Sequence, residues 1–523
     1  MNKTRYPVAL FTLGALVIFG LWFLLPLLRD RAQRQTSDAG AIKATIRCAH
    51  DNFVGYFILR SPELKKRLRQ KQVNLKCGKA EDDNANYAER MQKLEKGEID
   101  IAVMTVDTDV LNGFPVGYPG VIAFVIDESR GADAVLASKA SGIKNLNDLK
   151  GKTNIRVTLT RNSPSHHLGK VAVTHFGIPE LLKNIVPADG SPDALSKVLS
   201  DVADIGIVWE PDVSRGLEKG AVKLLGTEET SRVVVDVLLV NRKFGDRNPG
   251  LMLLLIDEYF QVLKYYRDNL DILRKEVAEE AGIKDLAVID VMLRGVYWVN
   301  LTENCMLWFG CPSAGANAEF GLAKTIDSTV AILLANKDFP KNPLPDQSAE
   351  SLIRSVYLDK AYAVSTTGTF TTAGATKAYA PVPDSLTAVF KPLPDEAWKV
   401  LRVVATLRDR PISFQSGTAT LDTLGKEELD EAIENLSHYP KFRLIVKGHT
   451  ALRGDSFANK ALSQDRADAA KRYVTVTYGI DENRIQAVGR GSEEPLKRLP
   501  GENDRSYSYR LPRIELLLVA EVY

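Results

Sequence analysis

The feature that most constrains this chain is a long alternation of short apolar runs and amphipathic stretches between residues 41 and 358. The apolar runs have the length and composition of buried strands. Between them, apolar residues recur three and four positions apart, which is typical of helices that cover a sheet. This alternation predicts an α/β architecture with mostly parallel sheets, divided into two lobes. The predicted strands are ATIRC, VNLKC, IDIAVMTV, GVIAFVI, AVLAS, IRVTLT, IGIVW and VVVDVLLV.

Two further segments follow this unit. Residues 359–393 are rich in Thr, Gly, Ala and Pro and lack a sustained apolar period, so we predict a linker. Residues 394–523 have the order strand, helix, strand, helix, strand, strand, and the second helix is expected to begin behind Ser463. This order predicts a compact α+β domain in which helices pack on one sheet.

The N-terminal segment, residues 1–35, is predicted to be a membrane anchor. Residues Pro7 to Leu28 carry no charge, and about 20 apolar residues match the ~30 Å hydrocarbon core of a bilayer. The bulky, charged flank RDRAQRQ does not resemble a signal-peptide cleavage site. The basic residues around the segment lean slightly against export of the body, but long domains often translocate regardless of that count.

Composition and cysteine spacing narrow the function classes. A net charge of +2 without a long basic run gives no reason to expect nucleic acid as a partner. The cysteines form no CxxC pair and the histidines are few and scattered, so no metal or cofactor is predicted. Cys48 and Cys77 end two predicted neighbouring strands, and a disulfide and two buried thiols are both compatible with that placement. The state of Cys305 and Cys311 is not predicted.

Polar residues follow several of the predicted strands at the places where α/β proteins bind small ligands. Ser163 and Ser165 are the most informative, because they precede a helix whose free N–H groups favour an anion. Plain capping of that helix is the alternative, and it stays open. No nucleophile, base and orienting group lie in one short neighbourhood, so we expect a binding protein and not an enzyme.

Several stretches of residues 41–358 resemble the periplasmic solute-binding proteins of ABC importers, in the branch that binds nitrate, taurine, alkanesulfonates and thiamine precursors. They are IDIAVM, the SPSHHL segment and IGIVWEPDVSRGLEKGAVKLLGT. The resemblance implies two lobes that close on a hinge around a small solute. Carried over by position, it implies a cleft lined by Asp51, Asn52, Thr105, Asp107, Ser163, Ser165, His166, Trp209 and Glu210. An oxyanion or sulfonate-like solute is expected, although Asp51 and Glu210 disfavour a double anion and leave a zwitterion or cation open.

The C-terminal unit resembles the OmpA-like peptidoglycan-binding domain. The segment GHTALRGDSFANKALSQDRADAAKRY keeps most of that family's pattern, and YGIDENRIQAVGRGSEEP and LPRIEL match its later segments. The resemblance implies a site for the diaminopimelate of the peptide stem, in which an arginine binds the carboxylate and an aspartate binds the ammonium. The implied residues of this chain are Thr450, Asp455, Asn459 and Arg466.

Ala451 stands at the position of the family's aspartate, so the carboxylate that would bind the ammonium group of diaminopimelate is missing. Losing a hydrogen bond to a charged group costs about 1.5–3 kcal/mol, or roughly 10- to 150-fold in affinity. Asp455 is a candidate partial substitute. A retained fold used for protein contact is the alternative to peptidoglycan binding.

Together these features predict a single-pass inner-membrane protein of a diderm bacterium with a periplasmic body. It would bind a small solute and tether to peptidoglycan. A stator subunit of an ion-driven motor has a similar layout but needs an ionisable residue in the membrane, and Pro7 to Leu28 has none. A scaffold whose cleft is degenerate is the third hypothesis, and ligand-induced thermal stabilisation separates it from the first.

Overall fold

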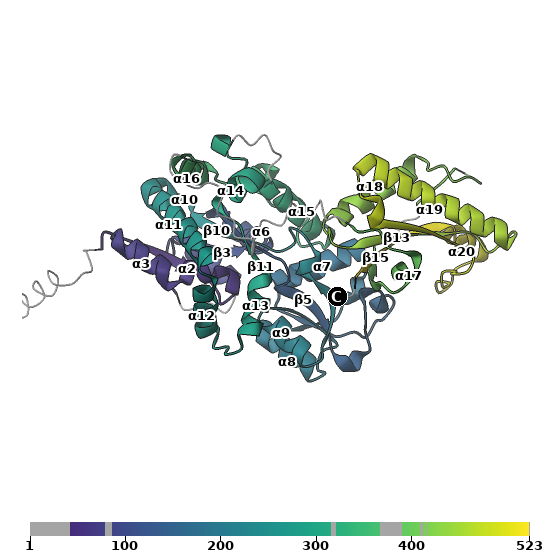
Figure 1. Ribbon diagram of the computed structural model, residues 1–523, viewed down its shortest axis with the longest axis horizontal. Coiled ribbons are helices and arrows are strands. Elements are labelled where there is room, and N and C mark those ends of the chain that lie inside the picture. Colours follow the sequence, from purple (N-terminus) through teal and green to yellow (C-terminus); the bar gives the residue numbers. More distant parts are fainter. Residues whose placement is uncertain are drawn as a thin grey trace, which may run out of the picture.

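The structure is a computed structural model that describes residues 42–78, 86–314, 321–366, 390–407, 412–415 and 417–521. The predicted anchor, including Pro7 to Leu28, lies outside these residues. Within them, no helix combines the length and the apolar character needed to cross a membrane. Figure 1 shows two α/β lobes followed by a smaller C-terminal domain.

The first lobe is built on a six-stranded sheet with the order β11-β4-β10-β3-β1-β2. Strand β4 is buried along its whole length because helices cover both faces of the sheet. The strands are β1 (Ala44–Ala49), β2 (Val73–Cys77), β3 (Ile101–Thr105), β4 (Gly120–Ser129), β10 (Val235–Asn241) and β11 (Val296–Trp298). The helices are α2 (Phe57–Arg60), α3 (Pro62–Gln70), α5 (Tyr87–Glu95), α6 (Val106–Gly113), α10 (Arg242–Arg247), α11 (Pro249–Asp268), α12 (Leu270–Ala281), α13 (Leu286–Arg294), α14 (Leu301–Glu303), α15 (Gly321–Ala335) and α16 (Val356–Thr366).

The second lobe is inserted between β4 and β10 and has a five-stranded sheet with the order β7-β6-β8-β5-β9. Its strands are β5 (Asp133–Ala137), β6 (Val157–Leu159), β7 (Ile185–Pro187), β8 (Ile205–Trp209) and β9 (Val222–Gly226). Its helices are α7 (Pro164–Phe176), α8 (Ser191–Leu199) and α9 (Asp212–Glu218). The chain therefore crosses between the lobes twice, once before β5 and once after β9.

The sequence predicted mostly parallel sheets, but the sheets of both lobes contain parallel and antiparallel strand pairs. Strands β1, β2 and β3 pair in parallel, as do β6, β7 and β8. Strands β4 and β10 pair antiparallel, because the chain leaves the first lobe along one and returns along the other. Strands β5, β9 and β11 also make antiparallel pairs.

The C-terminal domain has a four-stranded sheet with the order β12-β15-β13-β14. Helices α18 and α19 pack on one face of it, which confirms the predicted α+β layout (Figure 1). Its elements are α17 (Asp395–Lys399), β12 (Arg402–Thr406), α18 (Thr423–Ser437), β13 (Arg443–His449), α19 (Ser456–Tyr478), β14 (Ile485–Gly491), α20 (Asp504–Arg510) and β15 (Arg513–Ala520).

Two element boundaries differ from the prediction. Helix α19 begins at Ser456 and not behind Ser463, because Asp455 Oδ1 accepts a hydrogen bond from the backbone N–H of Ala458 and caps the helix. Helix α16 runs into the segment assigned to the linker, because Leu358 and Ala361 are buried in the core of the first lobe. The remainder of that segment up to residue 389 lies outside the described residues.

Cys48 and Cys77 form a disulfide, which resolves one alternative that the sequence left open. The two residues are register partners at the ends of the parallel strands β1 and β2. Cys305 and Cys311 are free and buried.

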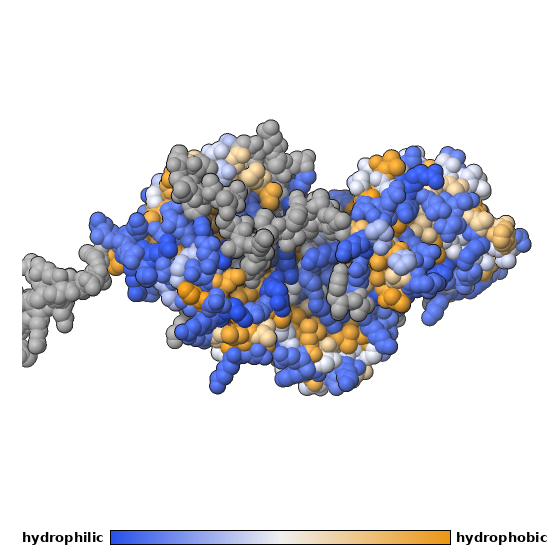
Figure 2. All heavy atoms as spheres, viewed as in Figure 1, coloured by the Kyte–Doolittle hydropathy of each residue, from blue (hydrophilic) through white to orange (hydrophobic). Residues whose placement is uncertain are grey.

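The C-terminal domain packs directly on the second lobe. Apolar residues of the two form one continuous buried cluster. The hydroxyl of Tyr439 lies 2.9 Å from Nδ1 of His175, and Arg402 pairs with Glu229 at 2.6 Å. The face of the molecule in Figure 2 is mostly hydrophilic outside small apolar groups, in keeping with a charged fraction of 26%.

Candidate functional site

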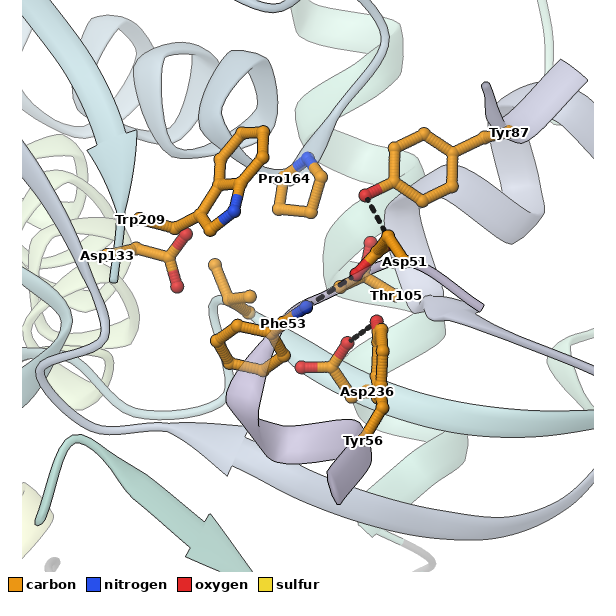
Figure 3. Close-up of a pocket in the computed structure, with 10 residues that line it drawn as sticks. Asp51, Phe53, Tyr56, Tyr87, Thr105, Asp133, Pro164, Trp209 and Asp236 are labelled. Atoms are coloured by element: carbon orange, nitrogen blue, oxygen red, sulfur yellow. Dashed lines mark hydrogen bonds between the residues drawn. The ribbon is translucent and has the colours of Figure 1, made fainter. Parts of the chain in front are cut away.

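A small cavity that is open to solvent lies between the two lobes. Figure 3 shows side chains from both lobes pointing into it. The first lobe supplies residues after β1 and at the end of β3, and the second supplies the end of β8 and the start of α7. The described lining residues are Asp51, Phe53, Tyr56, Tyr87, Thr105, Asp133, Pro164, Trp209, Val234 and Asp236.

Asp51 is held at the wall of the first lobe by several donors. Its Oδ1 accepts from the backbone N–H of Phe53 at 3.0 Å, and its Oδ2 accepts from Tyr87 at 3.4 Å. Arg90, which is 1% exposed, forms an ion pair with the same Oδ2 at 3.1 Å. The charge of Asp51 is therefore balanced from behind the cavity wall.

Asp236 belongs to a buried pair of carboxyl groups. It lies directly opposite Asp127 in the antiparallel register of β10 and β4, and the two residues are 1% and 0% exposed. Tyr56 donates its hydroxyl to Oδ1 of Asp236, and the carboxyl groups of Asp127 and Asp236 are hydrogen-bonded to each other. Burial raises the pKa of both carboxyl groups well above the usual range, and their mutual repulsion adds to it for Asp127. Such a pair holds at least one proton near neutral pH.

Asp133 lies at the first crossing between the lobes. Ser129 donates to its Oδ2 at 2.6 Å, and its backbone N–H donates to Oγ1 of Thr227 at 3.1 Å. Thr227 lies at the second crossing and is also 2.7 Å from Oγ of Ser129. Burial raises the pKa of Asp133 to about 7, a change that the hydrogen bond from Ser129 opposes. A polar network thus joins the two crossings at the edge of the cavity.

The N-terminus of α7 serves mainly its own cap. Ser163 Oγ donates to the carbonyl of Thr160 at 2.6 Å and accepts from the backbone N–H of His166 at 3.5 Å. Pro164, the first helical residue, has no N–H to offer. Ser165 is fully buried, and burial lowers the pKa of His166 to about 3, so that its imidazole is neutral. Ser163 therefore has the capping placement that the sequence left as the alternative, whereas the hydroxyl of Ser165 has no partner among the described residues.

Of the remaining residues predicted to line the cleft, three line the cavity and three do not. Asp51, Thr105 and Trp209 line the cavity. Asn52 is exposed, and Asp107 is buried in α6, where burial raises its pKa to about 6. Glu210 accepts from both the backbone N–H and the hydroxyl of Ser214 and so caps α9.

Most of the residues that line the cavity were not predicted from the sequence. Asp133 and Asp236 were overlooked although each interrupts an apolar strand, in ADAVLAS and VVVDVLLV. A carboxylate in such a run is costly to bury and is a signal of a polar role. The aromatic residues Phe53, Tyr56 and Tyr87 gave no comparable signal, because aromatic residues are common in cores.

In the C-terminal domain, several motif residues bring α19 close to the sheet. A Cβ atom on Gly448 would lie 2.0 Å from the carbonyl oxygen of Ser463, and one on Gly489 would lie 2.5 Å from the backbone nitrogen of Gln464. Ser463 Oγ accepts from the backbone N–H of Gly491 at 2.8 Å. Only glycine permits this approach, so these motif positions fix the place of the helix.

The predicted peptidoglycan site is only partly assembled. Arg466 lies over the ring of Phe414 and donates from Nε to the carbonyl of Thr418 at 3.0 Å. No carboxylate among the described residues pairs with its guanidinium group, and burial lowers its pKa. Thr450 is 5% exposed, and its hydroxyl has no described partner.

Two further positions of that site support the loop. Asn459 Nδ2 donates to the carbonyl of Arg453 at 3.1 Å, which holds the loop before α19. The carboxylate of Asp455 is engaged as the cap of the same helix. Asp455 is therefore poorly placed to replace the carboxylate that is missing at Ala451.

One polar cluster in this domain has the donor types of a metal site. The ligand atoms of His449, Glu494 and Glu515 lie within 4.8 Å of one another. Arg513 donates to Glu515, and Lys447 and Arg490 pair with Glu494 at 3.3 Å each. These cations already balance the carboxylates, so the cluster fits a structural network better than a cation site.

Comparison with known proteins identifies the C-terminal domain. The model of the OmpA family matches residues 413–508. The peptidoglycan-associated lipoprotein of Haemophilus influenzae is 33% identical over 107 residues, which are 20% of this chain and 68% of that protein. The chain belongs to the OmpA family. The probable lipoprotein YiaD of Escherichia coli is 35% identical to this chain over 85 residues, which are 16% of this chain and 38% of that protein. The chain thus spans well under half of YiaD.

The two lobes have neighbours among solved structures. The periplasmic aliphatic sulphonate binding protein SsuA of Escherichia coli aligns with a TM-score of 0.46 and 18% identity, over 60% of this chain and 92% of that chain. A similarity at this level carries no argument about the ligand, which has to be inferred from the cavity of this chain.

Proposed function

We propose that the two lobes form a solute-binding module that closes around a small molecule. The supporting observation is the cavity, whose lining comes from both lobes and includes the C-terminal ends of β3 and β8. Ligands of open α/β folds bind at such strand ends. The contacts of Ser129 and Asp133 with Thr227 lie at the two crossings between the lobes, where a hinge is needed.

In this proposal the OmpA domain holds the module to the cell wall. Arg466 supports it, because its guanidinium has no described carboxylate partner and is available to the carboxylate of diaminopimelate. Ala451 leaves the ligand's ammonium without a counter-charge, so we expect weaker binding than in relatives that keep an aspartate. The test is co-sedimentation of the full chain with purified sacculi, in which Arg466→Ala should abolish the bound fraction.

We place the body in the periplasm and the segment from Pro7 to Leu28 in the inner membrane. Two observations support an extracytoplasmic body: the Cys48–Cys77 disulfide, which persists in oxidising compartments, and membership of the OmpA family. Protease treatment of spheroplasts tests this placement. Digestion of the region after Lys441 in intact spheroplasts is expected, and its protection would place the body in the cytoplasm.

A scaffold without a ligand is the alternative, and the buried cluster shared by the second lobe and the OmpA domain favours it. Thermal unfolding of the full chain in the presence of a solute panel separates the two. A ligand that binds only the folded chain raises the melting temperature, by mass action. Trp209→Ala, which removes a lining side chain, should abolish that rise, whereas a scaffold would show no rise with any solute.

A further inference from the structure

The ionisable side chains in the described lining of the cavity are all acidic. Asp51, Asp133 and Asp236 contribute carboxyl groups, and the described lining includes no lysine, arginine or histidine. Four aromatic side chains, from Phe53, Tyr56, Tyr87 and Trp209, fill most of the remaining wall. Figure 3 shows Trp209 and Asp133 on one side of the space and the tyrosines, Asp51 and Asp236 on the other.

The groups near the cavity that could receive an anion are either engaged or, like the unpartnered hydroxyl of Ser165, fully buried outside its lining. The guanidinium of Arg90 is paired with Asp51 and lies 4.9 Å from the ring centroid of Tyr87. At the N-terminus of α7, Ser163 takes the N–H of His166, and Pro164 has none. A sulfonate or carboxylate in this cavity would lie near Asp133 and Asp236, which pair with no cation among the described residues.

The same wall suits a positive charge. The buried carboxyl of Asp236 accepts from Tyr56 and is hydrogen-bonded to the carboxyl of Asp127, and an ammonium group from a ligand can replace the proton that this pair holds. Aromatic faces attract ammonium groups through their quadrupole, and the attraction grows when the site excludes water. Asp133 comes from the second lobe and Asp236 from the first, so a cation between them would attract both walls.

We propose that this cavity binds a small organic cation, with its ammonium group held by Asp133 and Asp236 and enclosed by the aromatic side chains. This inference rests on the proposed solute-binding function and specifies its ligand class. Burial disfavours the ionised form of these carboxyl groups in the empty cavity, and the raised pKa of Asp133, about 7, reflects this. A bound cation stabilises the ionised form and displaces protons from the site.

The test is isothermal titration of the full chain in detergent at pH 8 with four probes. Choline and putrescine carry ammonium groups, 3,3-dimethylbutan-1-ol is the neutral isostere of choline, and ethanesulfonate is an anion. We expect saturable binding of at least one cation, with the neutral isostere at least 10-fold weaker. Asp133→Asn and Asp236→Asn should each weaken cation binding by about 10- to 150-fold.

The matched control is Asp193→Asn, which removes a carboxylate that pairs with Lys197 on the surface of the second lobe. It should leave the affinity for the cation unchanged. Equal binding of choline and its neutral isostere overturns the inference, and so does binding of ethanesulfonate alone, which leaves the solute-binding function intact. Absence of binding by both cations also overturns it, and a solute screen that then finds no ligand removes the proposed function as well.

Discussion

Restoring the missing carboxylate by Ala451→Asp is expected to strengthen peptidoglycan binding. The corner that carries residue 451 is already fixed, because Thr450 donates its backbone N–H to the carbonyl of Gly491 at 2.9 Å. A new carboxylate there needs little further ordering of the loop, so most of its interaction energy is retained. One charge-assisted contact contributes about 1.5–3 kcal/mol, which corresponds to a roughly 10- to 150-fold lower Kd.

The assay is co-sedimentation of the full chain with purified sacculi over a range of sacculus concentrations. Leu452→Asp is the matched control, because it adds the same charge one residue away at a side chain that is 52% exposed. The reasoning predicts a gain for Ala451→Asp alone, and the gain should disappear in combination with Arg466→Ala. An unchanged Kd, or an equal gain for both substitutions, would refute the assigned role of position 451.

Three further predictions concern the cavity, the disulfide and the packing of α19. The pKa of Asp133 is raised to about 7 in the folded chain, so its carboxyl group is protonated below that pH and the affinity for a cation should fall by up to tenfold per pH unit. Cation titrations of Asp133→Asn at several pH values should show a smaller dependence of the affinity on pH. The Cys48–Cys77 disulfide joins residues 29 positions apart, so its reduction should lower the free energy of unfolding, measured by urea denaturation, by about 3–4 kcal/mol. Reductant should have no effect on a variant in which both cysteines are replaced by alanine. Gly448→Ala should destabilise the chain by about 3 kcal/mol or more because its Cβ meets the main chain of α19, whereas Gly250→Ala, which has no neighbour within 4 Å, should leave the melting temperature within about 1 °C of wild type.

The sequence predicts the elements of this fold better than their arrangement. Runs such as ATIRC and VVVDVLLV have strand composition, and each forms a strand at nearly the predicted place. Strand direction depends on where the chain crosses between lobes, and no local pattern carries that information. The early start of α19 could have been predicted from Asp455, because aspartate is a common N-cap residue and accepts a hydrogen bond from the backbone N–H three residues later, here that of Ala458.

The cavity illustrates a second limit. Asp51, Thr105 and Trp209 line it because they lie at or just after the C-terminal ends of strands, which is a local property that the sequence displays. Asp127 and Asp236 become a pair only through the register of β4 and β10, which are distant in sequence. Ser163 and Glu210 were equally plausible from sequence, and their use as helix caps depends on contacts within their own turns.

The packing of the OmpA domain on the second lobe has a mechanical consequence. Because the two share a buried cluster and the Arg402–Glu229 ion pair, we expect them to move together when the lobes close. In the proposed function, the wall-bound part would then include the second lobe, and the first lobe would move relative to it about α15, whose Ser328 and Ile332 contact His438 and the shared cluster.

Solute-dependent closure of the lobes tests the central claim most directly. The measurement is energy transfer between dyes at Glu279→Cys on α12 and Val202→Cys in the second lobe, two side chains that are 69% and 47% exposed. The dialysable small-molecule fraction of a periplasmic extract serves as ligand, so the result does not depend on the ligand's charge. The account predicts a saturable change in transfer efficiency that Trp209→Ala abolishes. An unchanged efficiency at every concentration of the extract, with the labelled chain folded, would contradict it.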